Sequence, residues 1–195
     1  MKAFFTMAVF GFLSMVAVCD AAPPPFPQQE NATENPLEIG ESYFLAQEYR
    51  KALQPLLIAA GDGLGRASFL LGEMYEFALG VEQDQITASV FYMFGAHQGF
   101  GDAQFRIANR IERGVFAPYD RVASLKWYLL AAQNPTTTHS LKRSAQSAIT
   151  IFVQRDCAEC AEQLRQAEIL AKDWKPVYDF DRIVEELSKP PADVR

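Results

Sequence analysis

The chain has 195 residues, which is enough for one domain with a short appendage. Hydrophobic residues make up 49% and charged residues 22%, so the composition is that of a globular protein and excludes wholesale disorder. The net charge of −6 argues against nucleic-acid binding, because phosphate contacts require a basic surface. With two histidines and three cysteines, a four-ligand metal site would need nearly all of them, and we expect no metal or other cofactor.

The first 22 residues have the pattern of a secretory signal peptide. Lys2 gives a positive start, residues 3–18 are almost uninterrupted apolar sequence, and small residues follow at Ala21 and Ala22. The apolar run is shorter than the roughly 20 residues that a membrane-spanning helix needs. We therefore expect cleavage after Ala21 or Ala22 and export to the periplasm or out of the cell. No later segment is apolar for long enough to span a membrane.

Cys19 keeps a second interpretation of this segment open. The run Val16-Ala17-Val18-Cys19 resembles the lipobox of bacterial lipoproteins, in which the cysteine is acylated and becomes the first residue of the mature chain. It departs from that pattern at Val18, where a small residue is usual. An uncleaved anchor is a further alternative. Residues 23–36 follow as a linker, because their prolines and polar residues cannot bury enough surface to fold.

A period of 36 residues runs through the next part of the chain. A shift by 36 places Asp84 on Asp120 and Tyr92 on Tyr128. Self-similarity at a fixed period indicates a repeat architecture, in which each unit buries its apolar face against the next. The copies are a degenerate one at 37–65, with a shorter inter-helix loop, and two full ones at 66–101 and 102–135.

Each full copy is predicted to contain two helices. Apolar residues between Arg66 and Phe77 follow the i, i+3, i+4 spacing of one helical face. After a loop, Asp84 stands where an N-cap carboxylate can accept the first free backbone N–H groups. The second helix is expected to end at Gly99. The predicted helices are Arg66–Phe77, Ile86–Gln98, Asp102–Arg113 and Val122–Gln133, the last one capped by Asp120.

Small and aromatic residues recur where neighbouring helices should meet. Small side chains let helices approach closely, and rings then fill the space between layers. The predicted packing positions are Ala67, Gly72, Tyr75, Ala88, Tyr92, Ala96, Ala103, Ala108, Trp127, Tyr128 and Ala132.

This pattern resembles the Sel1-like repeat, a 36-residue relative of the tetratricopeptide repeat. The resemblance covers roughly residues 37–135, and the second full copy departs from it at Ala108, Ser124 and Asn134-Pro135. It rests on Ala67, Leu71-Gly72, Tyr75, Gly80-Val81, Asp84, Ala88, Phe91-Tyr92, Ala96, Gly99 and Ala103. It implies an all-α solenoid of stacked antiparallel helix pairs that binds a protein or peptide and is not an enzyme. Bacterial members often work in the cell envelope or at a host interface.

Two further helices, Ser140–Gln154 and Ala158–Trp174, are expected to close the stack within residues 136–176. The second, which ends before Pro176, resembles the closing helix of exported bacterial Sel1-like proteins. Residues 177–195 are expected to form a tail, with a short helix at 181–187.

Cys157 and Cys160 form a CxxC motif with two interpretations. In an exported protein it favours a structural disulfide, provided that residues 156–160 form a distorted first turn with Asp156 as cap. A thiol–disulfide accessory role is the alternative, although the βαβ pattern that accompanies such motifs is missing from the sequence. A zinc site lacks a second ligand pair at a suitable spacing.

Charged residues on the first helices are candidates for partner binding. In this architecture the first helix of each pair usually lines the concave face, and a solvated helix surface is the alternative. The candidates are Glu73, Glu76, Arg106, Asn109, Arg110 and Arg113. His97 is expected to act as a cation or donor near helix-end carbonyls, and His139 to face solvent.

Overall fold

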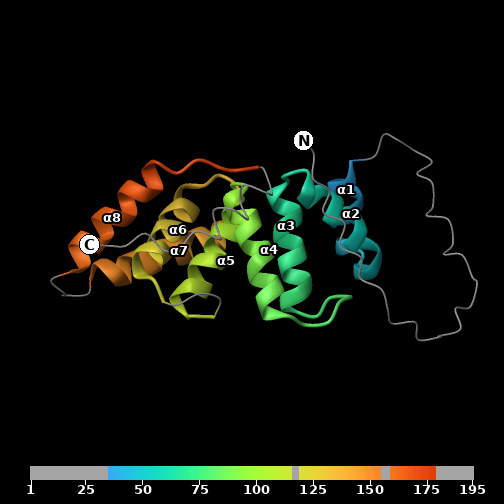
Figure 1. Ribbon diagram of the computed structural model, residues 1–195, viewed down its shortest axis with the longest axis horizontal. Coiled ribbons are helices and arrows are strands. Elements are labelled where there is room, and N and C mark those ends of the chain that lie inside the picture. Colours follow the sequence, from blue (N-terminus) through green and yellow to red (C-terminus); the bar gives the residue numbers. More distant parts are fainter. Residues whose placement is uncertain (1–34, 116–118, 155–158, 179–195) are drawn as a thin grey trace, which may run out of the picture. The chain divides into compact units, whose positions relative to one another are not determined.

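The computed structural model describes residues 35–115, 119–154 and 159–178 (Figure 1). The chain divides into two units, Met1–Thr33 and Glu34–Arg195, and the described residues all belong to the second. The predictions for the signal peptide, for most of the linker, for Asp156 and Cys157, and for the helix at 181–187 lie outside the described residues.

The described residues form eight helices and no strand. The helices are α1 (Pro36–Leu45), α2 (Tyr49–Gly61), α3 (Gly65–Glu76), α4 (Gln85–His97), α5 (Gly101–Glu112), α6 (Arg121–Gln133), α7 (His139–Val153) and α8 (Cys160–Lys172). Each of the pairs α1/α2, α3/α4 and α5/α6 packs as a hairpin, and α2 packs on α3 as α4 packs on α5. The hairpins therefore stack in sequence order, and the predicted all-α solenoid is confirmed (Figure 1).

The first helices of successive pairs also touch one another, since α3 contacts α5 and α5 contacts α7. At the end of the stack, α7 and α8 both pack on α6, and α8 contacts α6 more extensively than it contacts α7. This end has a small core of its own around Leu125, Phe152, Cys160 and Ala167. The closing helices α7 and α8 thus cover α6, but they do not pack on each other as a hairpin in the way that α5 and α6 do.

Aspartate caps begin the second helices of both full repeats, as the sequence predicts. The Asp84 carboxylate accepts hydrogen bonds from the backbone N–H groups of Ile86 and Thr87, and the Asp120 carboxylate accepts one from Ala123. Hydrogen bonds from the Thr87 hydroxyl and backbone hold the pKa of Asp84 below its usual value. The carboxylate therefore stays charged at the positive end of α4.

The predicted packing positions lie in one hydrophobic core, where all are buried except the half-buried Tyr75 and Ala132. Gly72 shows why one of them is small: a Cβ there would lie 2.6 Å from the Tyr92 ring. In the degenerate copy Gly40 faces Leu56 in the same way, also at 2.6 Å. The helices α1 and α2 therefore cross as closely as α3 and α4 do, although the loop between them is shorter.

Candidate interaction site

A polar network joins the first helices of the two full repeats. Arg110 on α5 is 5% exposed, and its guanidinium lies 2.9 Å from Glu76 on α3. The same guanidinium donates to the Ser89 hydroxyl at 2.9 Å and to Gln85 on α4, through the carbonyl at 3.2 Å and the side-chain oxygen at 3.0 Å. It also lies over the Tyr92 ring. Arg110 is thus satisfied within the fold.

Arg106 extends the network by one helical turn. Its guanidinium lies 3.3 Å from Glu73 and 4.0 Å from Glu76, between the rings of Phe77 and Tyr92. Burial raises the pKa of Glu73 even though Arg106 pulls it down. Both side chains remain partly accessible, with 30% of Arg106 and 22% of Glu73 exposed.

These contacts correct one expectation about the predicted binding residues. Arg110 does not present a free charge on the surface, because it is buried against the carboxylate of the preceding repeat. Asn109 is half-buried, and Arg113 is exposed at the C-cap of α5. A role of this set in partner binding stays a prediction, and the geometry assigns Glu76 and Arg110 to holding the repeats together.

A tyrosine–glutamate pair, which the sequence interpretation missed, ties the two helices of each full repeat. The Tyr92 hydroxyl donates to Glu76 at 2.6 Å, and the Tyr128 hydroxyl donates to Glu112 at 2.7 Å. Burial and the neighbouring carboxylate raise the pKa of both hydroxyls, so both remain protonated donors. The signal was available, because both partners recur at the same 36-residue spacing.

A second repeated bond, also missed, fastens the turns between hairpins. Gln98 accepts from the Ser68 hydroxyl at 2.8 Å and donates to the carbonyl of Ala60 at 3.2 Å. One repeat later, Asn134 donates to Gln104 at 3.0 Å and to the carbonyl of Gly99 at 2.8 Å. Amide side chains at equivalent positions therefore fix successive turns.

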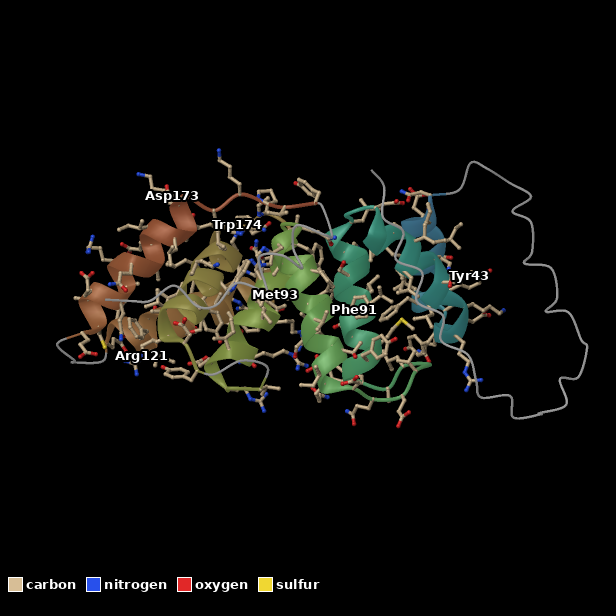
Figure 2. All side chains as sticks on the ribbon, viewed as in Figure 1. Tyr43, Phe91, Met93, Arg121, Asp173 and Trp174 are labelled. Atoms are coloured by element: carbon tan, nitrogen blue, oxygen red, sulfur yellow. The ribbon has the colours of Figure 1, made fainter. Side chains whose placement is uncertain are left out.

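An apolar groove lies on the second helices of the first two pairs. Its volume is about 380 Å³. Leu57 and Gly61 come from α2, and Val90 and Phe91 from α4, with the buried Ser68 hydroxyl beneath. Figure 2 shows Phe91 on α4, beside α3. The groove is therefore formed by helices of consecutive hairpins.

An extended segment, Trp174–Tyr178, lies on the turns at one end of the helices. In Figure 1 it is drawn in red and runs back from α8 past the ends of α6, α5 and α4. The Trp174 ring meets Trp127 on α6 edge to face at 6.0 Å, and the Val177 N–H donates to the carbonyl of His97 at 2.7 Å. Figure 2 labels Trp174 where the chain leaves α8.

His97 is buried where this segment crosses the end of α4. It is 9% exposed and meets the Trp127 ring edge to face at 5.2 Å. Burial, aided by Lys126, lowers the pKa of His97 to about 4, so the ring is neutral at pH 7. Of the two roles expected for His97, that of a cation is therefore wrong, and that of a donor stays a prediction. His139 is exposed as predicted.

Among the described residues, no group of three or more His, Cys, Asp or Glu side chains could hold a metal ion. In the same part of the chain, no helix is both long enough and apolar enough to cross a membrane. Cys160 is 5% exposed at the start of α8, and Cys157 lies outside the described residues, so their pairing stays a prediction.

Sequence comparisons give a partial relative. No protein-family model matches the chain. A curated relative, the ERAD-associated E3 ubiquitin-protein ligase component HRD3B of Arabidopsis thaliana, is 27% identical over 103 residues, which cover 53% of this chain and 17% of that protein. The chain thus spans about a sixth of the length of this relative.

Two solved structures have a similar fold. The crystal structure of a Sel1 repeat protein from Oxalobacter formigenes matches with a TM-score of 0.54 and 26% identity, over 70% of this chain and 54% of that one. A protective antigen of uropathogenic Escherichia coli strains, which displays an SLR fold, matches with a TM-score of 0.59 and 24% identity, over 82% and 33%. Together with the 36-residue period and the stacked hairpins, these likenesses show that the described residues have the fold of Sel1-like repeat proteins.

Proposed function

We propose that this chain is an exported scaffold that binds a peptide or protein partner in the cell envelope through its helical repeats and catalyses no reaction. One observation carries the proposal: the stack already binds an extended polypeptide segment, Trp174–Tyr178, across its turns. The relatives support a role in protein assembly, since HRD3B is named as a component of a ligase. Helical-repeat solenoids commonly offer such extended binding surfaces.

Export is supported by the signal-peptide pattern of residues 1–22. The intact mass of the protein recovered from its host tests this part of the proposal. We expect a chain that begins at Ala22 or Pro23 and is lighter by two hydrogens than its reduced form, because Cys157 and Cys160 are bridged. An acylated Cys19 at the N-terminus, or a mass that includes residues 1–22, would contradict cleavage at Ala21 or Ala22.

A thiol–disulfide accessory role through Cys157 and Cys160 is the alternative function. It is disfavoured because the βαβ pattern that accompanies redox CxxC motifs is missing from the sequence and the described residues contain no strand. Cys160 is buried with Leu125, Phe152 and Ala167, as a structural disulfide would be. We expect no turnover in a thiol–disulfide exchange assay.

Site-specific photo-crosslinking in the native host tests the scaffold proposal. A photoreactive benzoylphenylalanine replaces Leu57 in the apolar groove, Asp62 at the turn after α2, or Leu45 as a control. Leu45 is 80% exposed at the end of α1, outside the groove and the turns bound by Trp174–Tyr178. We expect a discrete protein adduct from position 57 or 62 and none from position 45.

The absence of an adduct from both test positions, or the same adduct pattern from position 45, would contradict the proposal. An adduct from position 57 alone would place the partner in the groove between α2 and α4. An adduct from position 62 would place it on the turns.

A further inference from the structure

We infer that the turns between hairpins form a track for extended peptides, that Trp174–Tyr178 occupies this track in cis, and that a partner segment of the same chemistry displaces it. That chemistry is an aromatic residue, a proline two positions later, then an apolar residue and a second aromatic one. We call the surface formed by Gly63, His97, Gly99 and Trp127 the turn edge. The inference rests on the proposed scaffold function and adds the surface and the partner chemistry.

Two glycines, one repeat apart, let a peptide backbone approach the turn edge. Gly63 and Gly99 have φ values of +82° and +86°, which favour glycine over residues with side chains. A Cβ on Gly63 would lie 3.1 Å from the Tyr178 carbonyl oxygen, and one on Gly99 would lie 3.3 Å from the Pro176 Cβ. Equivalent positions of successive repeats therefore contact successive parts of one extended segment.

The main-chain contact does not depend on the identity of the bound side chain. The Val177 N–H donates to the carbonyl of His97 at 2.7 Å, and any residue except proline can make this bond. Pro176 restricts its own φ and biases Lys175 toward extended conformations, so less conformational entropy is lost on binding. These are the features by which proline-containing peptides are recognised elsewhere.

Trp174 is the anchor of the segment. Its ring packs on Trp127 at 6.0 Å with an interplanar angle of 71°. Beside it, an open surface depression of about 320 Å³ is lined by the segment and by residues that include Leu130 and Gln133 of α6. The turn edge thus has an aromatic contact and space that the segment does not fill.

Several features indicate that the segment is held loosely enough to be displaced. The Trp174 indole N–H is buried and finds no acceptor among the described residues, which costs free energy. Lys175 and Pro176 are exposed, and Tyr178 is 60% exposed. A guest peptide with phenylalanine in place of the tryptophan makes the ring contact without burying an unpaired donor.

Binding of a labelled peptide to the full chain tests the inference. The probe is a fluorescein-labelled synthetic peptide with the sequence of residues 173–178, Asp-Trp-Lys-Pro-Val-Tyr. Fluorescence anisotropy compares the unmodified chain with Trp174→Ala, which weakens the segment held in cis. Lys175→Ala is the matched control, because it lies in the same segment and its side chain is exposed.

We expect Trp174→Ala to bind the peptide at least about tenfold more tightly than the unmodified chain, because a tethered segment competes at an effective concentration in the millimolar range. Lys175→Ala should bind as weakly as the unmodified chain. A peptide with phenylalanine in place of tryptophan should bind Trp174→Ala at least as well as the parent peptide, and one with alanine there should not bind.

Equal binding by the unmodified chain and a cooperatively melting Trp174→Ala variant would overturn the inference. Val177→Pro, which removes the donor to His97, gives an independent test of release. Loss of cooperative melting in both variants would also overturn it, since the segment would then be a permanent part of the fold. In either case the scaffold proposal is tested separately, by the crosslinks from positions 57 and 62.

Discussion

Arg106 and Arg110, which the sequence indicates as candidates for partner binding, lie against the carboxylates of the preceding repeat. For Arg110 this burial is nearly complete, and each hydrogen bond it donates goes to α3 or α4. When a buried ion pair loses one member, the other is left buried without a partner, which costs free energy. We therefore expect Arg110 and Glu76 to stabilise the packing of one repeat on the next.

Replacing Arg110 with methionine tests this assignment. The variant keeps an unbranched side chain but leaves Glu76 and Ser89 without their charged donor, so we expect the free energy of unfolding to fall by about 2–4 kcal/mol. Arg113→Met, at an exposed position of the same helix end, should change it by no more than about 0.5 kcal/mol. Urea unfolding followed by circular dichroism measures both, and equal stabilities of the two variants would refute the assignment.

His97 makes stability depend on pH in a defined direction. Its pKa is about 4 in the folded protein and about 6.5 in an unfolded chain, so below pH 6.5 the unfolded chain binds the extra proton. The stability contributed by the neutral ring is complete above pH 6.5 and is lost as the pH falls toward 4. Between pH 6.5 and 5 we expect a loss of about 2 kcal/mol from this group.

Urea titrations of the unmodified chain, His97→Gln and His139→Gln at several pH values measure that loss. His139 is exposed, so His139→Gln should keep the pH dependence of the unmodified chain, whereas His97→Gln should flatten it between pH 6.5 and 5. Parallel curves for all three proteins would show that His97 titrates normally.

At the scale of the helices, the 36-residue period predicts the helix bounds and caps, because each copy has small, aromatic and capping residues at the same positions. The four helices of the full repeats were predicted within about one residue at each end, and Asp84 and Asp120 cap them as expected. The burial of Arg110 could not be predicted from α5 alone, because it depends on which carboxylate faces it from α3. The packing of α8 on α6 likewise follows no repeated pattern.

The crossing of α3 and α4 depends on the missing side chain of Gly72. In Gly72→Ala the new Cβ would lie 2.6 Å from the Tyr92 ring, which is itself tied to Glu76, so we expect a loss of about 1–3 kcal/mol. Gly61→Ala is the matched control: nothing lies within 4 Å of its Cβ, and alanine should leave stability unchanged or raise it by up to about 1 kcal/mol. Thermal melting of the two variants decides this, and a loss in Gly61→Ala equal to that in Gly72→Ala would argue against a close crossing.

At the scale of the described stack, residues at the far end of the chain return to its earlier turns. Trp174–Tyr178 contact Trp127, Gly99, His97 and Gly63 in the reverse of the order of the repeats. The sequence predicts the end of the closing helix before Pro176, but it contains no period that would indicate where the following residues bind. Through this contact the stack of helices holds an extended segment of its own chain, and the proposed binding of guest peptides at the turn edge depends on it.

Amide hydrogen exchange at Val177, measured by NMR, tests that contact most directly. The Val177 N–H is bonded to the carbonyl of His97, and Lys175 lies exposed two residues earlier in the same segment. After correction for intrinsic rates, we predict that Val177 exchanges at least about tenfold more slowly than Lys175. If both amides exchange at the rate of an unstructured peptide, the segment is not bound to the turn edge and the account is contradicted.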